Sequence, residues 1–167
     1  MAPTSTMTTE AAALRHYLDA QRTSALAILD GLTEEQLRTS VLPSGWTPLG
    51  LIKHLGYAER HWFQTVFRGT PTEVPWPDDD GEALTAEHPV AEVFAFYREQ
   101  CERANAILAT TPLDAKPVGR HGSGRGDDEV SDLRGIVLHM IEETARHLGH
   151  LDAARELIDG RTGLGPR

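Results

Sequence analysis

Two side chains that can bind a metal ion, Glu143 and His147, lie four residues apart in a segment with a strong helical pattern. Residues with this spacing project from one face of a helix, so the pair could hold a single ion. A third candidate ligand is His54, which lies in another helical stretch. Zinc and similar ions favour imidazole and carboxylate ligands, and catalytic sites keep one coordination position open beside three protein ligands. The three residues therefore predict a catalytic metal centre.

A simpler interpretation of the pair is a surface contact, because an acidic residue and a histidine with this spacing stabilise a helix by a few tenths of a kcal/mol. The metal centre is favoured because Glu143 and His147 flank the apolar stripe of their helix, where a carboxylate without a partner is unfavourable. Arg146 could supply an ion pair instead, although it points away from this strip of the helix.

The other histidines fall into three groups. His139 lies one turn before Glu143. It could serve as a hydrogen-bond partner of the metal ligands or as an alternate ligand. His61 and His150 are candidate proton shuttles, although a hydrogen bond to a neighbouring residue is the more common role of such histidines. The remaining three are expected to face solvent: His16, His88 and His121.

Four long helical patterns must position these residues, and no strand pattern separates them. Thr47-Pro48 is a strong helix start, Ser131 can cap the last helix, and a capping box from Thr33 to Gln36 predicts a short helical turn. In such bundles, sites are built from inward side chains of facing helices. We expect an all-α fold, a four-helix bundle with crossover connections, with helices over about 9–32, 47–67, 89–111 and 131–158.

Two long irregular segments, 69–89 and 112–128, are expected to shape a pocket. Trp76 in the first segment is expected to anchor it. The glycine-rich stretch 119–126 lacks the Gly-Lys-Ser/Thr ending of a phosphate-binding loop, so it is expected to be a flexible loop.

Composition limits the function. With 167 residues, the chain suits one domain, 1–167, with flexible ends at about 1–8 and 160–167. A formal charge of −9 disfavours nucleic acid as a partner. No membrane span or signal peptide is apparent, so we expect a cytoplasmic protein with a small-molecule substrate, which could form a homodimer. Cys101 is the only cysteine, so a thiolate metal cluster is excluded, and we assign that residue no role.

Two segments together resemble the DinB superfamily: GWTPLGLIKHL at 45–55 and HMIEETARHLGH at 139–150. The resemblance spans nearly the whole chain and is strongest to DinB-like proteins common in actinobacteria. It implies a four-helix bundle with crossover connections and a three-residue metal site. Typical members supply one histidine from the second helix and two from the fourth, and Glu143 replaces the first of those two here.

The same His, Glu, His set is found in the mycothiol-dependent maleylpyruvate isomerase branch, whose N-terminal domain this chain resembles. The resemblance implies that His54, Glu143 and His147 bind a divalent metal, zinc first and nickel or another transition metal as alternatives. It further implies a mycothiol-like thiol that is presented as a thiolate to an electrophile.

Three functions follow as hypotheses. The first is a metal-dependent thiol transferase that acts on a small electrophile. The second is a metal-dependent hydrolase in which the ion activates water, with His150 or His61 as proton shuttle. The third is a non-catalytic protein that binds a metal or a small molecule.

Overall fold

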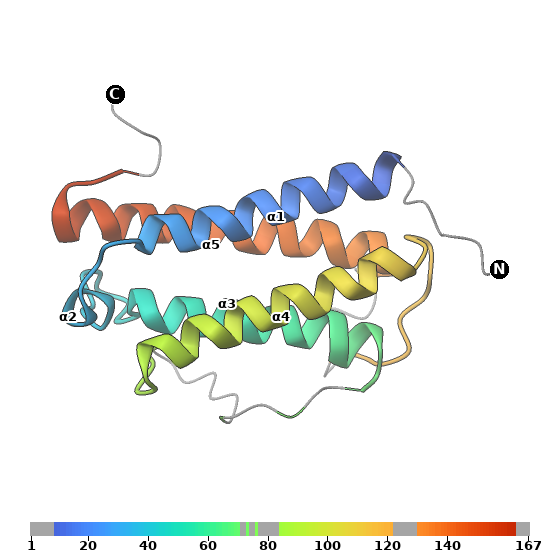
Figure 1. Ribbon diagram of the computed structural model, residues 1–167, viewed down its shortest axis with the longest axis horizontal. Coiled ribbons are helices and arrows are strands. Elements are labelled where there is room, and N and C mark those ends of the chain that lie inside the picture. Colours follow the sequence, from blue (N-terminus) through green and yellow to red (C-terminus); the bar gives the residue numbers. More distant parts are fainter. Residues whose placement is uncertain (1–8, 71–72, 74–75, 77–83, 122–129, 163–167) are drawn as a thin grey trace.

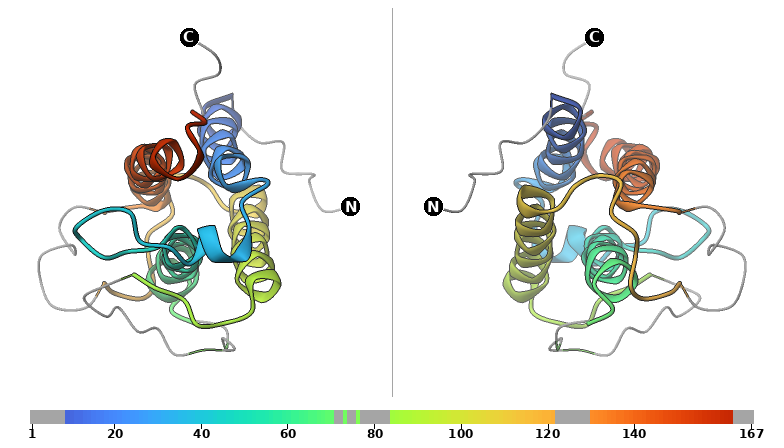
Figure 2. Two further views of the ribbon diagram at one scale, coloured as in Figure 1. Left: turned by 90° about the vertical axis from the view of Figure 1, so that its left-hand side faces the viewer. Right: turned by 90° about the vertical axis from the view of Figure 1, so that its right-hand side faces the viewer.

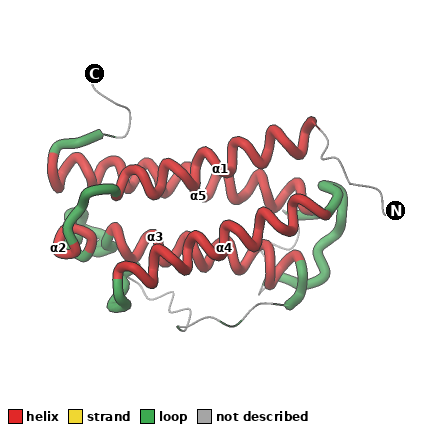
Figure 3. Tube along the Cα trace, viewed as in Figure 1, coloured by secondary structure: helices red, strands yellow, loops and turns green. Residues whose placement is uncertain are grey.

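The computed structural model describes residues 9–70, 73, 76, 84–121 and 130–162. Within these ranges the regular elements are all helical (Figure 3). They are α1 (Thr9–Leu29), α2 (Glu34–Leu37), α3 (Pro48–Arg60), the π-helix η1 (His61–Phe67), α4 (Val90–Thr110) and α5 (Leu133–Asp159). η1 continues α3 without a break, so the two form one long rod. The predicted flexible ends lie outside the described residues, except for 160–162. Residues 122–126 of the predicted glycine-rich loop also lie outside them.

The four long rods pack as two layers, α1 beside α5 and α3–η1 beside α4 (Figures 1 and 2). Figure 1 also shows that α1 and α5 run in one direction and that α3 and α4 run in the opposite direction. Because α3–η1 and α4 are parallel, the chain between them has to return along the length of the bundle. The predicted four-helix bundle with a crossover connection is therefore confirmed.

Most of the predicted helix starts are also confirmed. The Thr33 hydroxyl accepts a hydrogen bond from the backbone N–H of Gln36, whose side chain accepts one from the backbone N–H of Thr33. The Thr47 hydroxyl accepts a hydrogen bond from the backbone N–H of Gly50, with Pro48 at the first helical position. These contacts satisfy amides that a helix start leaves without partners.

Two predicted helix limits are wrong. Asp132, not Ser131, caps α5, because the Asp132 carboxylate reaches the backbone N–H of Gly135 at 3.0 Å while Ser131 is exposed. The first helix ends at Leu29 rather than near Leu32, because Gly31 adopts a left-handed conformation with φ of 76°.

The predicted apolar stripes form the core between the layers. Gly56 lets α3 approach α4 closely, since a Cβ atom at this position would lie 2.6 Å from the ring of Phe96. Ile141 is only partly buried, whereas the following core residues of α4 and α5 are buried: Val93, Phe96, Tyr97, Ile107, Leu108, Leu133, Val137, Met140, Thr144, Leu148 and Leu151.

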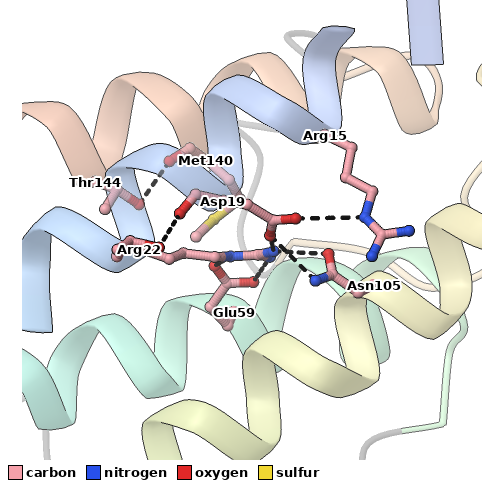
Figure 4. A network of polar contacts seen from close by, with 8 residues as sticks. Arg15, Asp19, Arg22, Glu59, Asn105, Met140 and Thr144 are labelled. Carbon is pink, nitrogen blue, oxygen red and sulfur yellow. Dashed lines mark hydrogen bonds and ion pairs between the residues drawn. The ribbon is translucent and has the colours of Figure 1, made fainter. Parts of the chain in front are cut away.

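A buried polar network crosses this core (Figure 4). Arg22 of α1 donates hydrogen bonds to both carboxylate oxygens of Glu59 on α3, at 2.7 and 2.6 Å. The same guanidinium donates to Asp19 and to Asn105 of α4, each at 2.8 Å. The network connects α1 to the rod that carries His54 and to α4. This network was not among the features predicted from the sequence.

Candidate metal centre

Three side chains from two helices converge at the seam between the layers. His54 comes from α3, and Glu143 and His147 come from α5. One Glu143 oxygen, Oε1, lies 3.2 Å from His54 Nε2 and 2.9 Å from His147 Nε2. One ligand atom from each of the three residues lies within 4.8 Å of the other two. The residues that the sequence predicted as ligands are thus brought together.

Local structure explains this convergence. His54 lies on α3 beside the buried Leu51 and Leu55, so its side chain leaves the flank of the core stripe and faces α5. On α5, Thr144 belongs to the buried stripe, which places the preceding residue, Glu143, at the edge of the core. The side chains of His54, Glu143 and His147 keep 24%, 24% and 16% of their accessible surface. The centre is therefore partly buried and still reachable.

The charge of Glu143 is fixed by its two histidine neighbours. The hydrogen bond from His147 and then that from His54 hold the pKa of Glu143 well below its usual range, although partial burial acts in the opposite direction. The carboxylate is therefore ionised. Arg146, the alternative ion-pair partner, is exposed, and the partners of Glu143 are the two histidines.

The donor set fits a divalent cation. One ionised carboxylate and two imidazole nitrogens are the ligand types that zinc and neighbouring transition metals favour. The other ring nitrogen of each histidine, Nδ1 of His54 and of His147, is buried and has no hydrogen-bond partner within the described ranges. Metal-binding histidines usually donate this N–H to an acceptor that fixes the tautomer. That acceptor is absent from the part of the chain that the structure describes.

A second histidine cluster surrounds Trp62 on η1. His61 Nε2 lies 2.7 Å from His121 Nδ1, and the His121 ring stacks on Trp62 with centroids 4.8 Å apart. His139 of α5 contacts the same indole at 4.3 Å. The prediction that His121 faces solvent is therefore wrong. His139 does not belong to the group of three residues whose ligand atoms lie within 4.8 Å of one another.

The remaining histidines have simpler settings. His16 is exposed, as predicted. The prediction for His88 is wrong, because its ring is partly buried and stacks on Trp76 at 4.3 Å. Trp76 is buried, as expected, and its backbone carbonyl accepts a hydrogen bond from the Tyr57 hydroxyl. His150 is exposed, with its ring 5.9 Å from that of His147.

Cys101 does not belong to the centre. It lies on α4 near the buried network, where burial raises the pKa of its thiol and the Glu59 carboxylate adds to the rise. A thiol in this setting is a poor nucleophile. This agrees with the assignment of no chemical role to Cys101.

Two cavities adjoin the helices without being lined by the three central residues. One of about 480 Å³ lies between α1 and α5 and is lined by Ser24, Leu148 and Arg161 among others. The other, of about 340 Å³, lies beside η1 and is lined by Trp62 and His121 among others.

Comparison with known proteins places the chain in context. In structure it is similar to a conserved protein from Enterococcus faecalis, with a TM-score of 0.70 and 12% sequence identity over 94% of this chain and 100% of that one. This likeness concerns the fold alone. No curated protein matches the sequence. Within the described residues, no helix is long and apolar enough to cross a membrane.

The family comparison is more specific. The model of the family described as Mycothiol-S-transferase matches residues 13–160, a range that includes all four long helices except the first few residues of α1. That range also contains His54, Glu143 and His147. The resemblance to DinB-like proteins and to their thiol-using branch is confirmed, and the chain belongs to the mycothiol-S-transferase family.

Proposed function

We propose that this chain is a single-domain, metal-dependent transferase that joins the sulfur of mycothiol to a small electrophile. The observation that carries the proposal is the convergence of His54, Glu143 and His147 inside the segment that matches the family. Membership of the family supports the thiol, and the ligand types support a divalent ion, with zinc first and nickel as an alternative.

The three residues have separate tasks in this proposal. His54 and His147 supply neutral nitrogen donors from opposite sides of the seam, which ties the ion to both layers of the bundle. Glu143 supplies one negative charge, so a divalent ion held here keeps a net positive charge. When bound, such an ion acts as a Lewis acid that favours the thiolate over the thiol at neutral pH.

The rest of the reaction needs a path for the electrophile and for a proton. The thiol proton leaves, the sulfur forms a bond to the electrophilic carbon, and a leaving group departs or an addition product takes up a proton. We propose that the described parts of the two long segments, chiefly 84–89 and 112–121, help to shape the pocket for this reaction. Most of 71–83 and all of 122–128 lie outside the described residues. The proposed location is the cytoplasm, where low-molecular-weight thiols remain reduced.

The test is a turnover assay on the purified protein with mycothiol and 1-chloro-2,4-dinitrobenzene as electrophile. We expect a rate above the uncatalysed reaction that disappears after treatment with a chelator and returns when zinc is added. The His54→Gln variant should lose this rate, whereas His16→Gln, a change at an exposed histidine of α1, should keep it.

The outcomes separate the hypotheses. Turnover that needs metal but no thiol, measured on ester and amide substrates, would favour the hydrolase. Metal binding with thermal stabilisation and no turnover on either panel would favour the binding protein.

A further inference from the structure

The cavity beside η1 has the features of a substrate site. We propose that it is the subsite for the electrophile and that it selects a small, partly apolar molecule with a carboxylate group. This role rests on the proposed function, because the ligand is taken to be the acceptor of the thiol. The binding of a carboxylate at this place does not depend on it.

One docked segment, residues 117–121, builds one wall of the cavity. The backbone N–H groups of Val118 and Gly119 donate hydrogen bonds to the carbonyls of Phe67 and Val66, each at 2.9 Å. A Cβ atom on Gly119 would lie 2.1 Å from the carbonyl oxygen of Thr65, so only glycine allows this approach. π-Helical turns such as η1 are frequent at functional sites. The docking fixes the backbone that leads to Arg120 and His121.

The docked segment places a hydrogen-bonded histidine pair at the cavity. His61 Nε2 and His121 Nδ1 are 2.7 Å apart, so one ring donates and the other accepts. When His61 donates, a neutral His121 carries its own proton on Nε2 and is a donor on the cavity wall. Stacking on Trp62 holds the plane of the His121 ring. This arrangement is suited to hold an oxygen acceptor.

The charge and polarity of the lining indicate the class of ligand. The chain has a formal charge of −9, yet the described lining contains Arg120 and His121 and neither aspartate nor glutamate. The other lining residues are mostly apolar: Trp62, Val66, Pro117, Val118 and Val130, with Gly119 and Ser131. A cationic end beside an apolar wall favours an organic anion. The volume of about 340 Å³ suits a small one.

The cavity lies along the same seam as the metal centre. His61 follows His54 by seven residues on one continuous rod, an axial separation on the order of 10 Å. On the facing helix, His139 contacts Trp62 and precedes Glu143 by one turn. A molecule whose carboxylate lies near Arg120 could therefore extend its other end toward the centre. Figure 1 shows the two rods facing each other along this length.

The binding experiment uses benzoate and its neutral counterpart benzamide, followed by the NMR signal of the Trp62 indole N–H, which the Trp62→Phe variant identifies. We expect benzoate to shift this signal saturably and benzamide to bind at least about fivefold more weakly. Arg120→Gln should weaken benzoate binding by a similar factor. Arg161→Gln, which changes a residue at the other cavity, should leave it unchanged. No shift with benzoate, equal binding of benzamide, or an equal effect of both variants would overturn the proposal.

The kinetic experiment uses 4-(bromomethyl)benzoate and 4-(bromomethyl)benzamide with mycothiol. In both, the sulfur bonds to the benzylic carbon as the carbon–bromine bond breaks, bromide leaves and the thiol proton goes to solvent. We expect KM to be at least about fivefold lower for the carboxylate and Arg120→Gln to remove this difference. Turnover of both with equal KM overturns the subsite. If neither compound is turned over, the result counts against the proposed function. The benzoate binding experiment is then the only test of the subsite.

Discussion

Replacing Glu59 by glutamine tests how the fold holds the rod that carries His54. Burial alone would lower the pKa of Arg22, but the Glu59 carboxylate outweighs it and the pKa is raised, so the guanidinium stays charged. The side chains of Arg22 and Glu59 keep only 5% and 1% of their accessible surface. In Glu59→Gln, an amide NH₂ replaces one acceptor and faces an N–H donor, and the buried positive charge loses its main counter-charge.

The magnitude follows from the remaining contacts. Removing one partner of a buried ion pair destabilises a protein by about 3–5 kcal/mol. Asp19 and Asn105 still accept from Arg22 in the variant, so we expect the lower end, about 3 kcal/mol. For a chain of this size, each kcal/mol lowers Tm by about 2–4 °C. Glu59→Gln should therefore lower Tm by about 6–12 °C.

Glu99→Gln is the matched control, because Glu99 pairs with Arg103 on the surface of α4 with side chains 53% and 43% exposed. Exposed pairs of this kind contribute about 0.3–0.5 kcal/mol, so Tm should change by about 2 °C or less. Differential scanning calorimetry at pH 7 measures both variants. Equal Tm values would refute the reasoning. A double replacement, Arg22→Met with Glu59→Leu, should recover more than half of the loss, because it leaves no buried charge without a partner.

Three further outcomes are expected. Cys101 should react with a disulfide reagent at pH 8 only after unfolding, since burial raises the pKa of its thiol. Asp132→Ala should lower the free energy of unfolding by about 0.5–2 kcal/mol in urea titrations, and Ser131→Ala by much less, because only Asp132 caps α5. In metal-free protein, the stability advantage of wild type over Glu143→Gln should shrink as pH falls below about 4.3. The pKa of Glu143 is lowered in the folded protein, so its carboxylate stabilises the fold in full only above the pKa that this group has in the unfolded chain.

Much of the architecture could be predicted because it depends on local patterns. Apolar residues at helical spacing define the stripes, and caps such as Thr33 and Thr47 mark where helices start. The site residues could be predicted for a related reason. Glu143 and His147 are four residues apart, so their side chains lie close together when the segment is helical. Both also flank the apolar stripe that faces the other layer.

Other features depend on contacts between distant segments. His121 meets His61 only because Gly119 docks on η1, and no local pattern around His121 indicates this. The π-helix could not be predicted either, because the hydropathy pattern of η1 also fits an ordinary α-helix. The Arg22–Glu59 pair did leave a signal: Arg22 follows Leu18 by four residues, and Glu59 follows Leu55 by four. Opposite charges inside the apolar stripes of two helices predict a buried pair.

The central claim is that His54, Glu143 and His147 form a site for a divalent metal, and the most direct measurement compares two neighbouring glutamates. Glu142 is exposed on the same turn of α5 as Glu143, so Glu142→Gln and Glu143→Gln make the same chemical change at adjacent positions. Calorimetric titration of metal-free protein with zinc should give one site in wild type and in Glu142→Gln. In Glu143→Gln the affinity should fall by at least about 100-fold, since a ligand and its charge are lost. Equal zinc affinity in the two variants, or no stoichiometric zinc binding to wild type, would contradict the account.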